Sequence, residues 1–149
     1  MVAGAPIFIS YSRRDYYFAE SLAFHLERHG VPVWLDAKDL QPGAFWQQQL
    51  ENALDNAACV VVVISADSIK RPAVRMEWER AKKQGKRIIV VLFRKAHVPE
   101  ELAQCELVDF RGGFIGPLRR LAERLAGAAI PTHTGRTWLP LPPWIGRYR

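Results

Sequence analysis

The sequence lacks any apolar stretch that reaches the roughly 18 residues needed to cross a bilayer. It also lacks, at its N-terminus, the basic segment and long apolar core of a secretion signal. We therefore expect a cytoplasmic protein, with no membrane partner for this segment. Cysteine is scarce: Cys59 and Cys105 fall in or beside apolar runs, without the spacing of a metal or redox site. Both are predicted to be reduced packing residues.

Several site patterns are absent too. The histidines at 25, 29, 97 and 133 share no spacing typical of metal or triad chemistry, so no metal site is predicted. No G-x-G-x-x-G, Walker A or G-x-S-x-G pattern occurs, so any nucleotide must be held in another way. The net charge of +6 belongs for about half to residues 128–149, which hold three arginines and no acid. Because the rest has no clustered basic face, nucleic acid is not an expected partner.

The chain has the length and apolar content of one compact domain. With 149 residues, 49% of them hydrophobic, it can bury a substantial core. Residues 128–149 are rich in Pro, Trp and Arg and show no helical or strand period. We predict a domain over residues 1–127, followed by a tail or linker over 128–149.

Strand and helix patterns alternate along that domain. Apolar runs predict five strands: the start of PIFISYSRRD at 6–15, VPVWL at 31–35, CVVVVI at 59–64, RIIVVLF at 87–93 and a short one at 106–110. Helical faces are predicted from Phe18, Leu22 and Leu26, from Trp46, Leu50, Ala53, Leu54 and Ala57, and from Phe114, Leu118, Leu121 and Leu125. This alternation predicts a flavodoxin-like α/β fold, a three-layer sandwich around a five-stranded parallel sheet.

The first strand ends abruptly in a polar loop, and carboxyl ends of parallel strands face the crevice where such sheets bind ligands. Ser10 to Arg14 combine hydroxyl and guanidinium groups there, which suits a pyrophosphate and ribose. An equally good interpretation is that Ser12 and Asp15 cap the following helix while the arginines are solvated. Ser65 and Ser68 are expected to cap the helix that carries Glu77.

Three segments in this order resemble a bacterial TIR domain: FISYSRRD at 8–15, VWLDAKDLQPG at 33–43 and SADSIKRPAVRMEWERA at 65–81. The resemblance covers roughly residues 6–127. It implies that 36–44 is the BB loop, a mobile connection used in self-association and in covering a nucleotide site. It also implies that Glu77 is the glutamate that hydrolyses NAD in enzymatic members, although Ala73 stands where they have an aromatic residue.

The reaction implied by this resemblance needs few catalytic groups. Nicotinamide leaves its ribose as a neutral base, so no general acid is required, and one carboxylate can stabilise the oxocarbenium-like sugar. From the local sequence alone, Glu77 is more simply a solvated helix residue paired with Arg80, while Glu79 pairs with Arg75 or Lys83. Glu79 points about 200° around the helix from Glu77, so the two cannot face one pocket.

The remaining site residues follow from the same resemblance and from their places in the predicted fold. Ser10, Tyr11 and Arg13 are expected to position the nucleotide. Asp36, at the end of the second strand, can hydrogen-bond a ribose or anchor the loop. Trp46 is more simply a core residue, with approach to a nucleotide ring as the alternative.

We thus expect an NAD+ hydrolase that releases nicotinamide and ADP-ribose or a cyclic form. The resemblance implies activation by self-association as a homo-oligomer, and antiphage or host-signalling roles. NAD+ is then a substrate, and no further cofactor is implied. The alternative is a non-enzymatic signalling module that binds other TIR domains through the BB loop and helix surfaces, and Ala73 favours it.

Overall fold

The computed structural model describes residues 5–43 and 45–129, and a parallel five-stranded sheet runs through them. The sheet order is β2-β1-β3-β4-β5. The strands are β1 (Ile7–Ser10), β2 (Val33–Trp34), β3 (Cys59–Ile64), β4 (Arg87–Leu92) and β5 (Glu106–Asp109). This confirms the predicted flavodoxin-like fold and its five strands.

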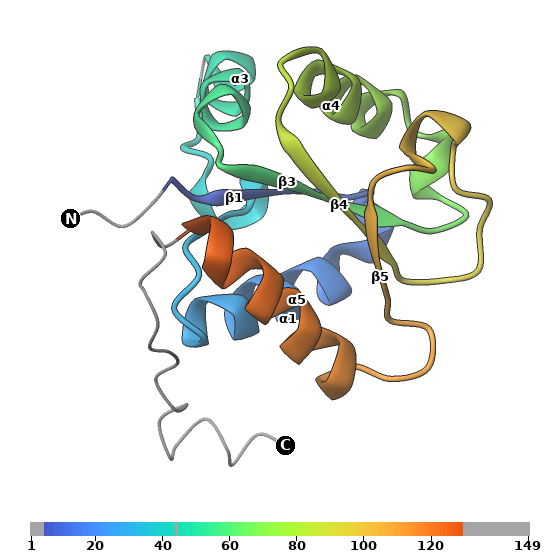
Figure 1. Cartoon of the computed structure of the whole chain (residues 1–149). Helices are drawn as coiled ribbons and strands as arrows, with labels where there is room; N and C mark the ends of the chain where they lie inside the picture. The colour runs from blue at the N-terminus through green and yellow to red at the C-terminus, as the bar shows by residue number, and fades with distance from the viewer. Residues whose placement is uncertain (1–4, 44, 130–149) are drawn as a thin grey trace.

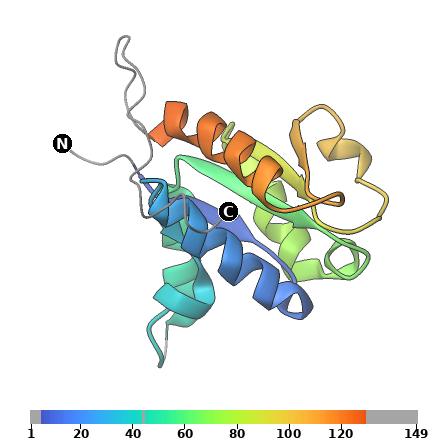
Figure 2. The ribbon, with the colours of Figure 1, turned by 90° about the horizontal axis from the view of Figure 1, so that it is seen from below.

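Helices cover both faces of the sheet (Figures 1 and 2). α1 (Tyr16–Arg28) and α5 (Ile115–Ala129) lie on one face, and α3 (Trp46–Asn56) and α4 (Pro72–Lys83) lie on the other. Four short elements join them: the 3-10 turns η1 (Arg13–Asp15), η2 (Ser68–Lys70) and η3 (Glu100–Leu102), and the one-turn helix α2 (Asp36–Asp39). The predicted tail at 128–149 lies outside the described residues, except for its first two positions, which end α5.

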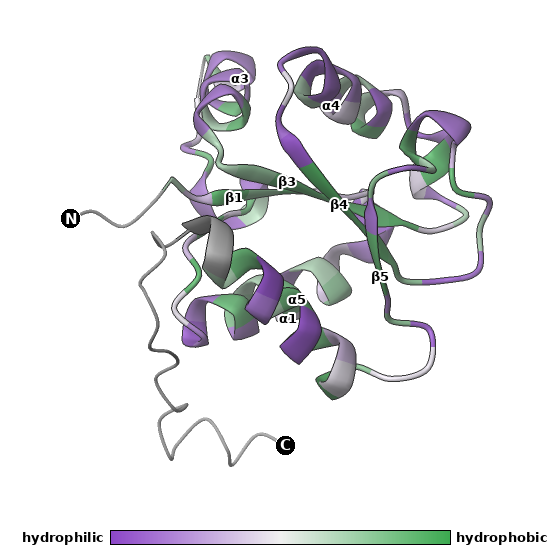
Figure 3. Cartoon of the chain, in the orientation of Figure 1, coloured by the Kyte–Doolittle hydropathy of each residue, from purple (hydrophilic) through white to green (hydrophobic). Residues whose placement is uncertain are grey.

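The core consists of two layers separated by the sheet, because successive strand residues point to opposite faces. Val61 and Val63 of β3 pack toward α1 and α5, whereas Val60 and Val62 pack toward α3 and α4. All six residues of β3 are buried, as expected for a central parallel strand. Figure 3 shows the apolar strands between helices whose outer faces are hydrophilic.

The second strand is shorter than predicted, since its flanks have other hydrogen-bond partners. The Val31 N–H donates to the Leu26 carbonyl at 3.0 Å, closing α1 through Gly30, whose φ is +84°. At the other end, the Leu35 N–H donates to the Asp39 carboxylate at 3.0 Å. Two residues remain for the ladder with β1.

The interpretation of Trp46 as a core residue is wrong, because its side chain is 54% exposed. α3 packs on the sheet through its C-terminal half, where Leu54 is buried and Leu50 and Ala53 are half-buried. Its first turn projects beyond that contact. The predicted loop at 36–44 also begins with a turn of helix, α2, rather than with irregular chain.

Cys59 and Cys105 are free thiols, the first buried and the second half-buried. In the part of the chain that the structure describes, no helix is both long and apolar enough to span a membrane.

Two leucines test the assignment of the core. Leu121 of α5 is fully buried, whereas Leu107 of β5 is 42% exposed. Truncating a buried leucine removes its burial and leaves a cavity, so Leu121→Ala is expected to lower the free energy of unfolding by about 2–5 kcal/mol. Leu107→Ala should cost clearly less. Urea unfolding of both variants measures the difference, and equal losses would contradict this packing.

Candidate functional site

The carboxyl end of β1 carries a hydrogen bond that joins the sheet to α4. Ser10, the last residue of β1, is 1% exposed, and its Oγ donates to Glu77 Oε1 at 2.5 Å. The two residues are 67 positions apart in the sequence. A half-buried carboxylate is therefore placed at the edge of the sheet where ligands bind in open α/β folds.

Glu77 points inward because α4 is amphipathic. Val74, Trp78 and Ala81 form its buried stripe, and Glu77 lies three residues after Val74 on the same side. The simpler interpretation of Glu77 as a solvated residue paired it with Arg80. Arg80 instead binds both carboxylate oxygens of Asp55, at 2.8 and 2.9 Å. The interpretation of Glu77 as a solvated, Arg80-paired residue is thus wrong.

Glu79 faces away from this stripe. Its side chain is 52% exposed and pairs with Arg75 at 3.5 Å, one of the two partners predicted for it. The prediction that Glu77 and Glu79 cannot share one pocket is confirmed.

Burial governs the ionisation of Glu77. It raises the pKa of this carboxyl to about 7, against a lowering effect from the Ser10 hydrogen bond, and the negative charge of Asp36 raises it further. At neutral pH the unliganded side chain is thus close to half protonated. The effect of Asp36 also shows that this second carboxylate lies near the first.

Asp36 is held by the residue that follows Ser10. Tyr11 Oη donates to Asp36 Oδ1 at 2.6 Å. Burial raises the pKa of the Tyr11 hydroxyl, and the hydrogen bond to Asp36 raises it further, so this tyrosine stays neutral and donates. Ser10, Tyr11, Asp36 and Glu77, four of the predicted site residues, are thereby brought together.

Arg13 and Trp46, the other two predicted site residues, lie at the periphery. Arg13 is exposed in η1, and its positive charge lowers the pKa of Tyr11, which places it near the group. Trp46 is exposed at the start of α3, and no interaction within the described residues joins it to Ser10 or Glu77. Ala73, one turn before Glu77, is exposed.

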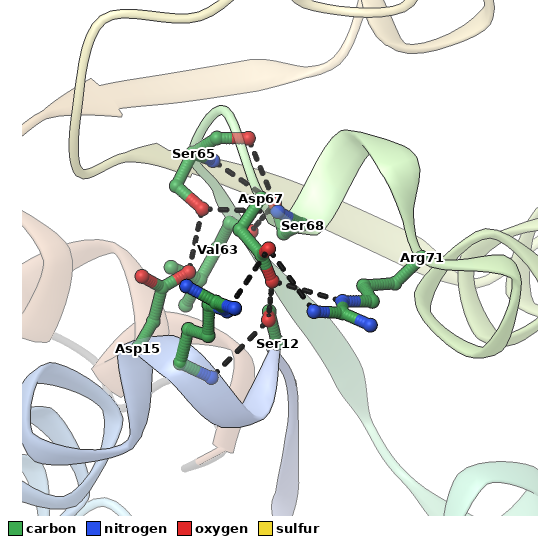
Figure 4. A network of polar contacts seen from close by, with 8 residues as sticks. Ser12, Asp15, Val63, Ser65, Asp67, Ser68 and Arg71 are labelled. Carbon is green, nitrogen blue, oxygen red and sulfur yellow. Dashed lines mark hydrogen bonds and ion pairs between the residues drawn. The ribbon is translucent and has the colours of Figure 1, made fainter.

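A network of polar contacts, which the sequence did not reveal, fixes the loop after β1 (Figure 4). The Asp15 carboxylate accepts a hydrogen bond from Ser65 Oγ at 2.5 Å. Asp67 accepts one from Ser12 and two from Arg71, at 2.9 and 3.1 Å, and pairs with Arg14 at 3.5 Å. The loop from Ser10 to Asp15 is thus tied to the turn after β3.

Two capping predictions are corrected by this network. Ser65 and Ser68 do not cap α4: the Ser65 N–H donates to Ser68 Oγ at 2.9 Å, and Ser68 Oγ donates to the Val63 carbonyl at 2.7 Å. α4 begins instead at Pro72, whose missing N–H suits a first helical position. Ser12 caps the 3-10 turn η1, by accepting from the Arg14 N–H, rather than the predicted helix α1, and Asp15 caps no helix with its side chain.

A family model described as a TIR domain matches residues 7–125. This chain belongs to the TIR domain family. The match spans both the site and the two helical layers, and it confirms the family predicted from the three sequence segments.

Several solved structures are similar to this chain. The TIR domain of the Toll-related receptor TRR-2 from Hydra magnipapillata is 25% identical, with a TM-score of 0.70, over 80% of this chain and 96% of that one. A prokaryotic SEFIR domain is 19% identical (TM-score 0.64, covering 90% and 99%), and the RPS4 and RRS1 TIR domain heterodimer is 15% identical (TM-score 0.60, covering 83% and 97%). The latter two likenesses establish the fold alone. The search of curated proteins gives no match.

Within this TIR domain the arrangement suits stabilisation of positive charge. Two carboxylates lie near each other at the sheet edge, each accepting a hydrogen bond from a neutral hydroxyl. Among residues 5–43 and 45–129, no group of three or more His, Cys, Asp and Glu side chains could hold a metal ion.

The raised pKa of Glu77 predicts a pH-dependent stability. The folded protein binds this proton more tightly than the unfolded chain, so the stabilisation is complete below the ordinary pKa of 4.5 and is lost as the pH rises through about 7. The loss amounts to about 3 kcal/mol. Glu77→Gln cannot ionise and should be more stable than the wild type at pH 8 by up to that amount, with little difference near pH 4.

Chemical denaturation at several pH values measures this effect. Glu79→Gln is the matched control on the same helix, since its exposed carboxylate should change stability by less than about 1 kcal/mol at any pH. A stability gap between wild type and Glu77→Gln that does not depend on pH would contradict the burial of this carboxyl.

Proposed function

We propose that this TIR domain is an NAD+ hydrolase in which Glu77 is the catalytic residue. The observation that carries the proposal is the hydrogen bond from buried Ser10 to half-buried Glu77 at the carboxyl end of β1. It holds one carboxylate in a fixed orientation at the edge where this fold class accepts ligands. A perturbed ionisation at such a place is typical of functional groups.

The reaction breaks the bond between the nicotinamide nitrogen and C1′ of the ribose. The electron pair leaves with the ring nitrogen, which turns a cationic pyridinium into neutral nicotinamide, and the sugar acquires oxocarbenium character. The Glu77 carboxylate stabilises that charge. A water adds to C1′ and releases one proton, giving ADP-ribose; attack by a nucleophile within the substrate gives a cyclic product instead.

The ionisation of Glu77 fits this role. With a pKa of about 7, the Glu77 carboxyl is only partly ionised in the free protein at neutral pH. A cation that binds beside it favours the ionised form. Ser10 keeps the carboxylate oriented, and the Ser12–Asp67 and Asp15–Ser65 contacts hold the loop that carries Ser10. Preorganisation of this kind lowers the reorganisation needed at the moment of bond cleavage.

The other predicted site residues have supporting roles in this proposal. Tyr11 and Arg13 position the nucleotide, with the Arg13 guanidinium suited to a phosphate group. Residues 36–44 cover the site when several copies of the chain assemble, which brings exposed Trp46 near a bound ring. NAD+ is the substrate, and self-association activates the domain in bacterial immunity or host signalling.

The exposed aromatic residues beside residues 36–44 favour a second candidate function, a non-enzymatic module that binds other TIR domains. Phe45 is 77% exposed and its φ is +72°, a left-handed conformation uncommon for a bulky residue, and Trp46 follows it. One similar structure is a heterodimer of two TIR domains. Under this candidate the loop binds another TIR domain without any turnover of NAD+.

Incubation with NAD+ tests the hydrolase directly. We expect the wild type to release nicotinamide and Glu77→Gln to lose at least about a hundredfold in rate, because the group that stabilises the transition state is gone. Glu79→Gln, on the same helix but facing solvent, should retain wild-type activity. Chromatography of the products distinguishes linear from cyclic ADP-ribose. Equal release by wild type and Glu77→Gln would exclude Glu77 as the catalyst.

Self-association is tested by a substitution in the loop. Gly43 has a φ of +115°, a conformation that residues with a side chain adopt only with strain. Gly43→Val should therefore change the loop and abolish concentration-dependent assembly, measured by light scattering or sedimentation, while the monomer keeps its circular dichroism spectrum. Assembly without nicotinamide release would favour the interaction module; a wild type that stays monomeric at every concentration would contradict both assembly roles.

A further inference from the structure

We infer that Asp36 is a specificity-determining residue, which makes the site select cationic, oxidised nicotinamide nucleotides over their neutral reduced forms. This inference rests on the proposed function and adds to it the charge of the ring that the site accepts. It comes from the juxtaposition of Asp36 with the Ser10–Glu77 pair at one edge of the sheet.

The turn that follows β2 brings Asp36 next to the residue that follows Ser10. β1 and β2 pair in parallel as Ile7 with Val33 and Phe8 with Trp34. Leu35 is still extended, with φ −127° and ψ 125°, and α2 begins at the next residue, Asp36. The hydrogen bond from Tyr11 Oη to Asp36 Oδ1, at 2.6 Å, places Asp36 beside the loop that follows Ser10.

The Ser10 side chain emerges on the face that α4 covers. Phe8 and Trp34 stack there with ring centroids 5.3 Å apart, and both belong to the layer of the core beneath α3 and α4. Because side chains two positions apart in a strand share a face, Ser10 follows Phe8. Asp36 begins α2, and its negative charge raises the pKa of Glu77, so it lies near the same place. Glu77 reaches the same place from α4 and accepts its hydrogen bond from Ser10.

The two carboxylates are held by neutral groups and not by cations. Asp36 accepts from the Tyr11 hydroxyl and Glu77 from the Ser10 hydroxyl. In the part of the chain described here, neither carboxylate takes part in an ion pair with an arginine or lysine; Arg13, the basic residue of this loop, acts on the Tyr11 hydroxyl. Two like charges at a half-buried edge repel each other, and each makes the other less favourable.

A cation placed beside this pair relieves the repulsion. The nicotinamide ring of NAD+ carries a positive charge, whereas the dihydropyridine ring of NADH has nearly the same size and no charge. The two dinucleotides share their riboses, adenine and phosphates, so the difference in their affinities isolates the ring charge. Asp36 and Glu77 should each contribute to that difference, as expected from Coulomb attraction over several ångströms.

Binding measurements on a protein that does not turn over NAD+ test the inference. In the Glu77→Gln background, we compare the dissociation constants of NAD+ and NADH by calorimetry, with and without Asp36→Asn. Asparagine keeps an oxygen that accepts the Tyr11 hydrogen bond, so only the charge is removed. The preference for NAD+ should fall about fivefold or more with Asp36→Asn. Asp55→Asn is the matched control, since that carboxylate lies in the last turn of α3, where it binds Arg80, and it should leave the preference unchanged.

The outcomes separate this inference from the hydrolase proposal. An unchanged preference in folded Asp36→Asn overturns the role of Asp36 even if the wild type releases nicotinamide. A reduced preference supports it even if the wild type releases none, which would contradict only the hydrolase. Binding of neither dinucleotide overturns both. Should Asp36→Asn fail to fold, Asp36→Ser, which keeps a hydroxyl oxygen and removes the charge, should also lower the preference, and an unchanged value would overturn the inference.

Discussion

The hydrogen bond from Ser10 to Glu77 depends on how α4 is docked on the sheet. Val74, Trp78 and Ala81 of α4 are almost fully buried, and their apolar contacts fix both the position and the rotation of the helix. Glu77 shares their stripe and is carried inward with them, although burial of a carboxyl is unfavourable on its own. Ser10 at the end of β1 meets it with one donor. Apolar packing therefore holds a polar group where it would not go by itself.

The two sides of the site differ in how firmly they are held. Around Ser10, the Asp15–Ser65 hydrogen bond and the Asp67 contacts with Ser12, Arg14 and Arg71 connect the loop after β1 to the turn after β3. Beyond Asp36, by contrast, Phe45 is exposed and lies in a left-handed conformation. The side around Ser10 is rigid, whereas the side around Phe45 is exposed and strained. This combination suits a site that is completed by a ligand or by a second molecule.

Much of this fold is predictable from local patterns, whereas the site contacts are not. Continuous apolar runs such as CVVVVI identify buried parallel strands, and Gly30 and Gly85 mark helix ends through positive φ values. The error at Trp46 arose because helical periodicity defines a face but not how far along the helix the sheet extends. β2 is short since Val31 and Leu35 donate their N–H groups elsewhere. The Asp15–Ser65 and Ser10–Glu77 pairs join residues far apart in sequence, and no local signal names such partners.

Glu77 and Asp36 also show why a family resemblance and a physical description complement each other. The resemblance singles out Glu77, which local sequence would place in solvent, and the hydrogen bond from Tyr11 adds Asp36, which the resemblance leaves without a definite role. At position 73, an exposed alanine offers no ring for a pyridinium to stack on. Under the proposed function, attraction between the cationic nicotinamide ring and two carboxylates binds the ring in place of stacking on an aromatic side chain. Electrostatic attraction then replaces part of the binding that ring stacking would give. It acts only on the oxidised ring, because the reduced ring has nearly the same shape and no charge.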